Sequence, residues 1–123
     1  MRPDLVDVRV LIAEDELLIA IDLELGLLDL GCKVIGPFPR LRQVIAKAET
    51  EAVDIALLDM NLNGELVFPV IDILRRRLIP LIVISGYGDR KARRGTDCWP
   101  ALTKPYRFDV LTDMMRGALD SGC

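Results

Sequence analysis

The chain has 123 residues, a formal net charge of −3, 51% hydrophobic residues and no histidine. This length suits one domain with a single core, and the apolar content lets that core form without disulfides or a structural metal. The negative charge disfavours nucleic acid as a partner, and the absence of histidine excludes Ser-His and Cys-His catalytic pairs and histidine metal ligands.

Cysteine usage and hydropathy predict the cellular compartment. Cys32, Cys98 and Cys123 show no CxxC spacing, which favours free thiols in a reducing compartment over disulfides or a zinc site. No apolar run approaches the roughly 20 residues that span a bilayer, and the start of the chain lacks an apolar signal sequence. We therefore expect a cytoplasmic protein with no membrane partner. No repeat or Gly/Ser-rich linker divides the chain, so residues 1–123 are expected to form one domain with no output domain.

Short apolar runs alternate with amphipathic segments, which is typical of βα units around a parallel sheet. The first half of the chain predicts two strands and two helices in alternation, at Val8–Ala13, Glu16–Leu30, Lys33–Gly36 and Leu41–Glu49. In the first helix, five apolar residues recur at helical spacing: Leu17, Leu18, Ile21, Leu25 and Leu28.

The second half opens with an apolar strand at Ile55–Leu58, whose lack of polar alternation is typical of a strand covered on both faces. A turn at Asn61–Gly64 follows it. The remaining predicted elements are a helix from about Val67 to Arg77, strands at Leu81–Ile84 and Ala101–Thr103, and a last helix at Asp109–Leu119. Residues 86–100 contain three glycines and many charges, which predicts a fourth helix that is short, irregular or mobile.

Four of the apolar runs end on polar residues that phosphoryl chemistry could use. Glu14 and Asp15 follow the first predicted strand, Asp59 the third, Ser85 the fourth and Lys104 the fifth. Because the carboxyl ends of parallel strands converge at one edge of the sheet, we expect these side chains to lie together. Three carboxylates, a hydroxyl and an ammonium would there form a site for a divalent metal and a phosphoryl group.

Each of these residues also has a simpler structural interpretation. Adjacent carboxylates at Glu14 and Asp15 repel each other without a cation, which suggests Mg²⁺, or they cap the next helix. Asp59 could form an aspartyl phosphate as a nucleophile, or only begin a turn. Ser85 could bond a phosphoryl oxygen or only end a strand; Lys104 could bind a phosphoryl oxygen or extend into solvent. Their joint occurrence at four strand ends favours the phosphoryl site.

With these residues in this order, the chain from Val8 to Leu119 resembles the receiver domain of two-component response regulators. The acidic pair, Leu-Leu-Asp-Met-Asn-Leu around Asp59, the hydroxyl after the fourth strand and Thr-Lys-Pro after the fifth follow the family's order. The resemblance implies an α/β fold with a doubly wound, five-stranded parallel sheet of the flavodoxin-like or CheY-like type. It also implies a phosphoacceptor signalling domain and not an enzyme, one that could slowly dephosphorylate itself.

The resemblance further implies a role for each site residue. Asp59 would accept the phosphoryl group, and Ser85 and Lys104 would hold its oxygens. Three carboxylates and one backbone carbonyl would bind Mg²⁺, from Glu14, Asp15, Asp59 and Asn61 respectively.

Shorter motifs are similar to the single-domain subgroup called FAT GUY receivers. They are Asn-Leu-Asn-Gly-Glu, Ser-Gly-Tyr-Gly and Leu-Thr-Lys-Pro-Tyr, although Ile84-Ser85 replaces the subgroup's Ala-Thr. The resemblance implies a sensor histidine kinase or a phosphotransfer protein as donor, and an unknown downstream protein as target. A homodimer through the fourth helix, fifth strand and last helix would also fit the family.

One position departs from the family pattern. Many receivers carry a tyrosine or phenylalanine three residues before the lysine, and its rotation reports phosphorylation. Ala101 occupies that position here, and the aromatic residues nearby in the sequence are Trp99, Tyr87 and Tyr106. Whether one of them replaces the usual aromatic is left open by the sequence.

Two alternative functions use the same residues. A haloacid-dehalogenase-like phosphatase also combines an aspartate nucleophile, a hydroxyl, a lysine and Mg²⁺. It typically needs Asp-x-Asp near its first strand, whereas Asp59-Met60-Asn61 lies mid-chain and lacks the second aspartate. The other alternative is a receiver that only docks to a partner and is never phosphorylated, which Mg²⁺-dependent binding of beryllofluoride would distinguish.

Overall fold

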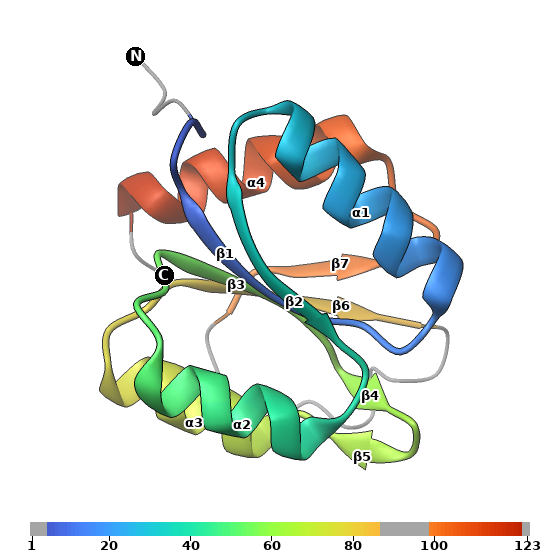
Figure 1. Ribbon diagram of the computed structural model, residues 1–123, viewed down its shortest axis with the longest axis vertical. Coiled ribbons are helices and arrows are strands. Elements are labelled where there is room, and N and C mark those ends of the chain that lie inside the picture. The colour runs from blue at the N-terminus through green and yellow to red at the C-terminus, as the bar shows by residue number, and fades with distance from the viewer. Residues whose placement is uncertain (1–4, 87–98, 122–123) are drawn as a thin grey trace.

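The computed structural model describes residues 5–86 and 99–121 (Figure 1). The predicted fourth helix falls largely on residues 87–98, outside the described residues. The first half of the chain forms β1 (Arg9–Ala13), α1 (Leu17–Asp29), β2 (Lys33–Phe38), α2 (Leu41–Thr50) and β3 (Ile55–Asp59). The second half forms β4 (Asn61–Leu62), β5 (Glu65–Leu66), α3 (Phe68–Arg76), β6 (Leu81–Ser85), β7 (Ala101–Thr103) and α4 (Phe108–Ser121).

Five of the strands form one parallel sheet in the order β2-β1-β3-β6-β7. The connection from β1 leads to one edge of the sheet, and the connection from β2 crosses back to β3 on the other side of β1. This reversal makes the carboxyl ends of β1 and β3 a topological switch point, where ligands of such sheets bind. The predicted doubly wound α/β fold is confirmed.

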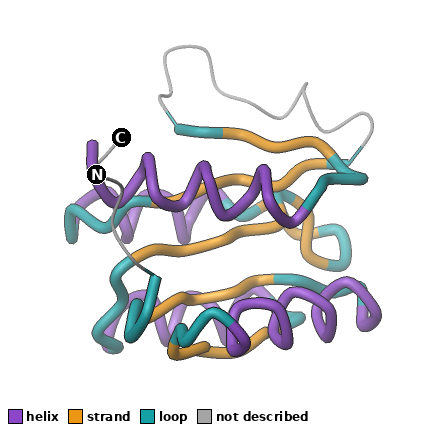
Figure 2. Tube along the Cα trace, turned by 90° about the horizontal axis from the view of Figure 1, so that it is seen from above, coloured by secondary structure: helices purple, strands orange, loops and turns teal. Residues whose placement is uncertain are grey.

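Helices cover both faces of the sheet, with α1 and α4 on one face and α2 and α3 on the other (Figures 1 and 2). The central strands alternate between the two cores because successive side chains of a strand point to opposite faces. In β3, for example, Ala56 and Leu58 pack toward α2 and α3, while Ile55 and Leu57 pack toward α1 and α4. No helix among residues 5–86 and 99–121 is long and apolar enough to cross a membrane.

The second strand is longer than predicted. We expected it to end at Gly36, because a proline cannot donate a hydrogen bond to a sheet, but β2 continues through Pro37 to Phe38. β2 is an edge strand, where proline is tolerated. Its pairing with β1 also shifts register between Ile35 and Phe38, so one extra residue of β2 is accommodated there as a bulge.

The predicted turn at Asn61–Gly64 is part of a small antiparallel hairpin formed by β4 and β5. Its two central residues, Asn63 and Gly64, have φ angles of +52° and +91°. Asn-Gly with two positive φ angles is the favoured two-residue hairpin turn. The sequence did not indicate the strands because each has only two residues.

The outward face of α1 is a further difference. The apolar residues recognised by their helical spacing are the exposed ones, between 41% and 78% accessible: Leu17, Leu18, Ile21, Leu25 and Leu28. The side chains of α1 that enter the core are Ala20, Leu23 and Leu27. Because α1 is apolar on two adjacent faces, spacing alone could not identify the buried one.

Candidate functional site

The strand ends bring the predicted residues to one edge of the sheet. Ala13, the last residue of β1, is paired with Leu58, and Asp59 follows at the end of β3. Asp59 is in turn paired with Ile84, one residue before Ser85. Ser85 is paired with Thr103, and its carbonyl accepts a 2.8 Å hydrogen bond from the Lys104 N–H. Register therefore places all four strand ends side by side.

Three carboxylates converge at this edge. Glu14, Asp15 and Asp59 each offer an oxygen, and these oxygens lie within 4.8 Å of one another. Glu14 and Asp59 are buried, with 2% and 4% of their surfaces exposed, and Asp15 is half-buried. Buried carboxylates this close repel each other strongly unless a cation or a proton lies between them.

Lys104 supplies part of the neutralising charge. Its ammonium lies 3.1 Å from Asp59 Oδ2 and 3.1 Å from both carboxylate oxygens of Glu14. Burial acts to lower the pKa of Lys104, but the hydrogen bonds and the negative charges of Asp59 and Glu14 together outweigh burial and raise that pKa. The lysine is therefore a permanent cation between two buried carboxylates.

The Asp59 carboxyl is strongly perturbed. Burial and the neighbouring charge of Glu14 raise its pKa to about 8, although the hydrogen bond from Lys104 opposes the rise. The Lys104 ammonium alone is thus too little positive charge to keep the Asp59 carboxyl fully ionised at neutral pH. A second cation at this edge would favour the ionised, nucleophilic form of Asp59.

The residues fit a hard divalent cation such as Mg²⁺. Glu14 Oε1 is buried and has no hydrogen bond; it is near the Lys104 ammonium, but the hydrogen bond from that ammonium goes to Oε2. An orphaned buried carboxylate oxygen beside two further carboxylates is the donor set that Mg²⁺ takes, with waters completing its shell. Glu14, Asp15 and Asp59 could together hold the ion.

Two contacts at the site involve residues that sequence reasoning missed. The Glu16 carboxylate lies 3.5 Å from the Lys104 ammonium as a third, largely exposed partner. The N–H of Asn63 in the β4–β5 turn donates a 2.9 Å hydrogen bond to Asp15 Oδ2 and so ties the hairpin to the acidic pair. Glu16 directly follows the acidic pair and could have been included; the contact of Asn63 depends on the hairpin.

Asn61 and Ser85 are both near the edge, with different contacts. Asn61 lies in β4, and its side-chain oxygen accepts a 2.7 Å hydrogen bond from the Gly64 N–H, which closes the hairpin turn. This bond involves the side chain only. The role of the Asn61 backbone carbonyl as a metal ligand stays a prediction. Ser85 is half-buried at the end of β6, one position beyond the pairing of Asp59 with Ile84.

The aromatic residues near Ala101 lie on opposite faces of the sheet. Trp99 is buried toward α3, with its ring centroid 6.1 Å from that of Phe68 and 5.7 Å from the Arg75 guanidinium carbon. Tyr106 is half-buried on the α1 and α4 face. Tyr87 lies outside the described residues.

Comparison with known proteins agrees with this geometry. The model of the response regulator receiver domain family matches residues 10–116. The transcriptional regulatory protein PdtaR of Mycobacterium tuberculosis is 28% identical over 107 residues; the match covers 84% of this chain, which spans about half (52%) of PdtaR.

Two solved structures illustrate the likeness of the fold. SdrG of Sphingomonas melonis Fr1 is 33% identical with a TM-score of 0.79, over 92% of this chain and 96% of SdrG, and it fits the subgroup suggested by the motifs. The receiver domain of the sensor histidine kinase PA1611 of Pseudomonas aeruginosa PAO1 has a TM-score of 0.80 at 22% identity, over 94% of this chain and 99% of that domain. That structure has a magnesium ion coordinated in its active site cleft. The family match, the sheet order and the converging acidic residues lead to one conclusion: the chain belongs to the response regulator receiver domain family.

Proposed function

We propose that the protein accepts a phosphoryl group on Asp59 from a phosphohistidine of a sensor kinase or phosphotransfer protein, and signals onward through a protein contact. The observation that carries the proposal is the position of the Asp59 carboxylate. It lies at a strand end within reach of two further carboxylates and 3.1 Å from the Lys104 ammonium. Phosphoryl transfer asks a protein mainly for positioning and charge neutralisation, and this edge offers both.

The proposed transfer forms one bond and breaks one. An Asp59 carboxylate oxygen attacks phosphorus, a P–O bond forms, the P–N bond to the donor imidazole breaks, and the imidazole leaves with the bond's electron pair. Lys104 holds Asp59 Oδ2 before attack and is positioned to hold a phosphoryl oxygen afterwards. Ser85, at the next strand end, would donate its hydroxyl to another phosphoryl oxygen.

Magnesium is part of the proposal. Glu14, Asp15 and Asp59 would hold the ion, with the carbonyl of Asn61 as a further ligand. When bound, Mg²⁺ would supply positive charge for the carboxylates and the incoming phosphoryl oxygens. Glu14 Oε1, which is buried and accepts no hydrogen bond, supports this part of the proposal.

The first prediction tests the phosphoacceptor. With Mg²⁺ and either acetyl phosphate or a phosphorylated histidine kinase, the wild-type protein should gain one phosphoryl group by intact mass, and Asp59→Asn should gain none. The amide keeps the size of the side chain but removes the nucleophilic oxygen. Asp54→Asn is the matched control: Asp54 precedes β3, at the opposite end of that strand from Asp59, so this variant should be labelled like wild type.

Equal labelling of the wild type and Asp59→Asn would contradict the assignment of Asp59. A wild-type protein that is folded, is not labelled and fails to bind beryllofluoride with Mg²⁺ would favour the alternative of a receiver that only docks. Either result overturns the proposal. If the wild type alone is labelled, signalling onward is tested by comparing the proteins captured by beryllofluoride-bound wild type and by Asp59→Asn.

A further inference from the structure

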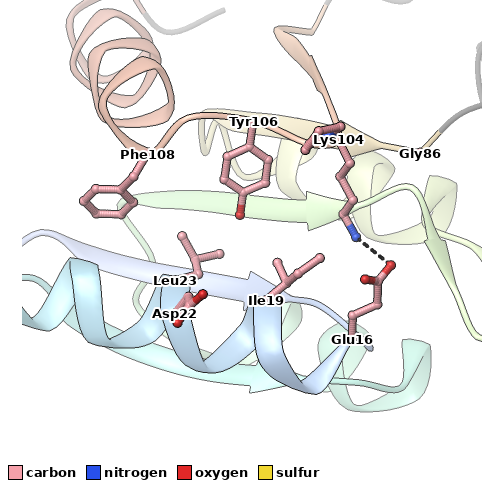
Figure 3. A pocket seen from close by; sticks show the side chains of 9 residues that line it. Glu16, Ile19, Asp22, Leu23, Gly86, Lys104, Tyr106 and Phe108 are labelled. Carbon is pink, nitrogen blue, oxygen red and sulfur yellow. Dashed lines mark hydrogen bonds and ion pairs between the residues drawn. The ribbon is translucent and has the colours of Figure 1, made fainter.

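A cavity of about 550 Å³ lies beside the phosphoryl site, between α1 and the connection from β7 to α4 (Figure 3). Glu16 and Lys104 lie at one end, and the ring of Phe108 lies at the other. This volume is within the range of sites that bind small organic molecules. None of the steps proposed for phosphoryl transfer uses the part of the cavity away from Lys104.

The wall of the cavity away from Lys104 is apolar and closely packed. Ile19 and Leu23 project from α1, and the rings of Tyr106 and Phe108 face them from the other side (Figure 3). The Phe108 ring packs directly on Gly26 of α1, where a Cβ atom would lie only 2.7 Å from the ring. A glycine inside a helix costs stability, and here it admits the aromatic ring that closes one end of the cavity.

The polar groups of the cavity favour a cation. Among the described residues that line the cavity, Lys104 is the only basic one, and its ammonium is already shared by Glu14 and Asp59 at 3.1 Å. Asp22 lies six residues beyond Glu16 in the chain, an axial rise along α1 of roughly 9 Å at 1.5 Å per residue. A ligand cation at Asp22 would therefore meet a carboxylate without close repulsion from Lys104.

Tyr106 adds a second polar group near Asp22. Its hydroxyl points into the space above Ile19 and Leu23 in Figure 3 and has no hydrogen-bond partner within the described part of the chain. Burial, followed by the nearby charge of Glu14, raises the pKa of Tyr106 to about 12, and the charge of Asp22 adds to the rise. The hydroxyl is thus protonated at neutral pH, with lone pairs that can accept a hydrogen bond from a cation.

We propose that this cavity binds an organic cation, an ammonium or guanidinium group carried on an apolar body. The charge would lie between the Asp22 carboxylate and the Tyr106 hydroxyl, and the body would pack against Ile19, Leu23 and the Phe108 ring. The aromatic rings also attract a cation placed over their faces. The cation has two chemical sources: a free amine, or the side chain of an arginine or lysine on another protein.

Nuclear magnetic resonance on the full ¹⁵N-labelled chain tests the proposal with three probes. These are phenethylammonium, its neutral analogue 2-phenylethanol, and N-acetyl-arginine methylamide. Phenethylammonium should cause saturable shifts at the amides of Leu23, Tyr106 and Phe108, and 2-phenylethanol should bind more weakly. Tighter binding of the arginine derivative than of phenethylammonium would identify a protein side chain as the source, and the reverse order would identify a free amine.

Two variants test the polar contacts. Asp22→Asn should weaken phenethylammonium binding roughly tenfold, because a charge-assisted hydrogen bond is lost. Tyr106→Phe should weaken it by a smaller factor, because only a neutral hydrogen bond is lost. The matched control is Asp29→Asn, an exposed carboxylate of the same helix outside the cavity lining, which should leave the affinity unchanged.

Unsaturable binding, equal affinity for the alcohol and the amine, or an unchanged affinity in a well-folded Asp22→Asn variant would each overturn the proposal. The dispersion of the amide spectrum shows whether each variant is folded. The test is independent of phosphoryl transfer, because Asp59→Asn keeps every residue that the proposal uses and should bind the amine as wild type does.

Discussion

At the residue scale, two sets of ion pairs in this protein differ in how well their charges are balanced, one in the acidic site and one at the surface. Lys104 is a half-buried cation shared among carboxylates, of which Asp59 has a pKa raised to about 8, and this arrangement suits a site that has to receive another charged group. The Arg9–Asp54 pair lies at the opposite end of the sheet and is well matched. Asp54 accepts three hydrogen bonds from Arg9, two from its guanidinium and one from its backbone N–H.

The Arg9–Asp54 pair predicts a specific pH dependence of stability. The hydrogen bond from the Arg9 side chain, more than any other contact, lowers the pKa of Asp54 below its usual value, and burial opposes that effect. Because the folded pKa is the lower one, the stabilisation is complete above the unfolded pKa of about 3.9 and is lost as pH falls through the folded pKa. In urea titrations, Asp54→Asn should therefore unfold with a smaller free energy than wild type at pH 5–7, and the difference should shrink below about pH 4.

Arg9→Gln provides the check on that cause. Removing the arginine side chain should reproduce most of the loss at neutral pH and the same convergence with wild type at low pH. A constant difference between wild type and Asp54→Asn from pH 7 to pH 3 would show that the pair contributes through packing and not through charge.

At the scale of the element, α1 joins three surfaces of the molecule. Its first turn starts at the acidic site, where the Glu16 N–H donates to Glu14 Oε2, and one face enters the core through Ala20, Leu23 and Leu27. Its outward face is an apolar stripe of five residues, with acidic residues on either side: Asp22 and Asp29 on one, Glu24 on the other. Only the face that enters the core stabilises the folded chain by burial, because the outward apolar stripe is exposed.

This difference between the faces of α1 is measurable. Leu23→Ala should lower the free energy of unfolding by about 2–5 kcal/mol, because Leu23 is buried and its removal leaves a cavity. Leu18→Ala is the matched control: the same change on the same helix at a position that is 78% exposed should alter stability by no more than about 0.5 kcal/mol. Chemical denaturation of both variants would decide, and a similar cost for the two would contradict the orientation of α1.

At the scale of the whole molecule, the fold gathers like charges that destabilise it. Glu14 and Asp15 follow β1, whereas Asp59 ends β3 far away in the sequence, and the parallel sheet brings their oxygens to within 4.8 Å. Such a site is expected to be most stable when a cation is bound, because a ligand that binds only the folded state shifts the unfolding equilibrium. Metal binding and fold stability should therefore be coupled.

Thermal unfolding with and without Mg²⁺ tests this coupling. At a Mg²⁺ concentration about 100 times its dissociation constant, the wild-type protein should gain about 2.7 kcal/mol of stability. Asp15→Asn should lose most of that gain, because one carboxylate of the set is removed. The matched control is Glu24→Gln, a carboxylate of α1 outside the acidic site, which should keep the full gain in stability. Equal stabilisation of the wild type and Asp15→Asn would show that the ion binds elsewhere.

The sequence by itself determined the order of the five main strands and their helices along the chain, and it indicated which residues reach the strand ends. Apolar runs such as Leu81–Ile84 are short and rich in β-branched residues, which favours buried strands, and register then places Asp59 beside Ser85 within one residue. The predicted cluster of Glu14, Asp15, Asp59 and Lys104 followed from parallel strand topology alone.

Only the tertiary structure decided which apolar face of α1 is buried, how β2 continues through Pro37, and how the β4–β5 hairpin reaches Asp15. Each depends on a neighbour distant in the sequence: the sheet face that α1 covers, the edge position of β2 in the sheet of described strands, and the position of the acidic pair. Local periodicity carries no information about such partners, because burial and pairing belong to the assembled sheet and not to one segment. The cavity between α1 and the β7–α4 connection exists for the same reason, since its walls meet only in the folded chain.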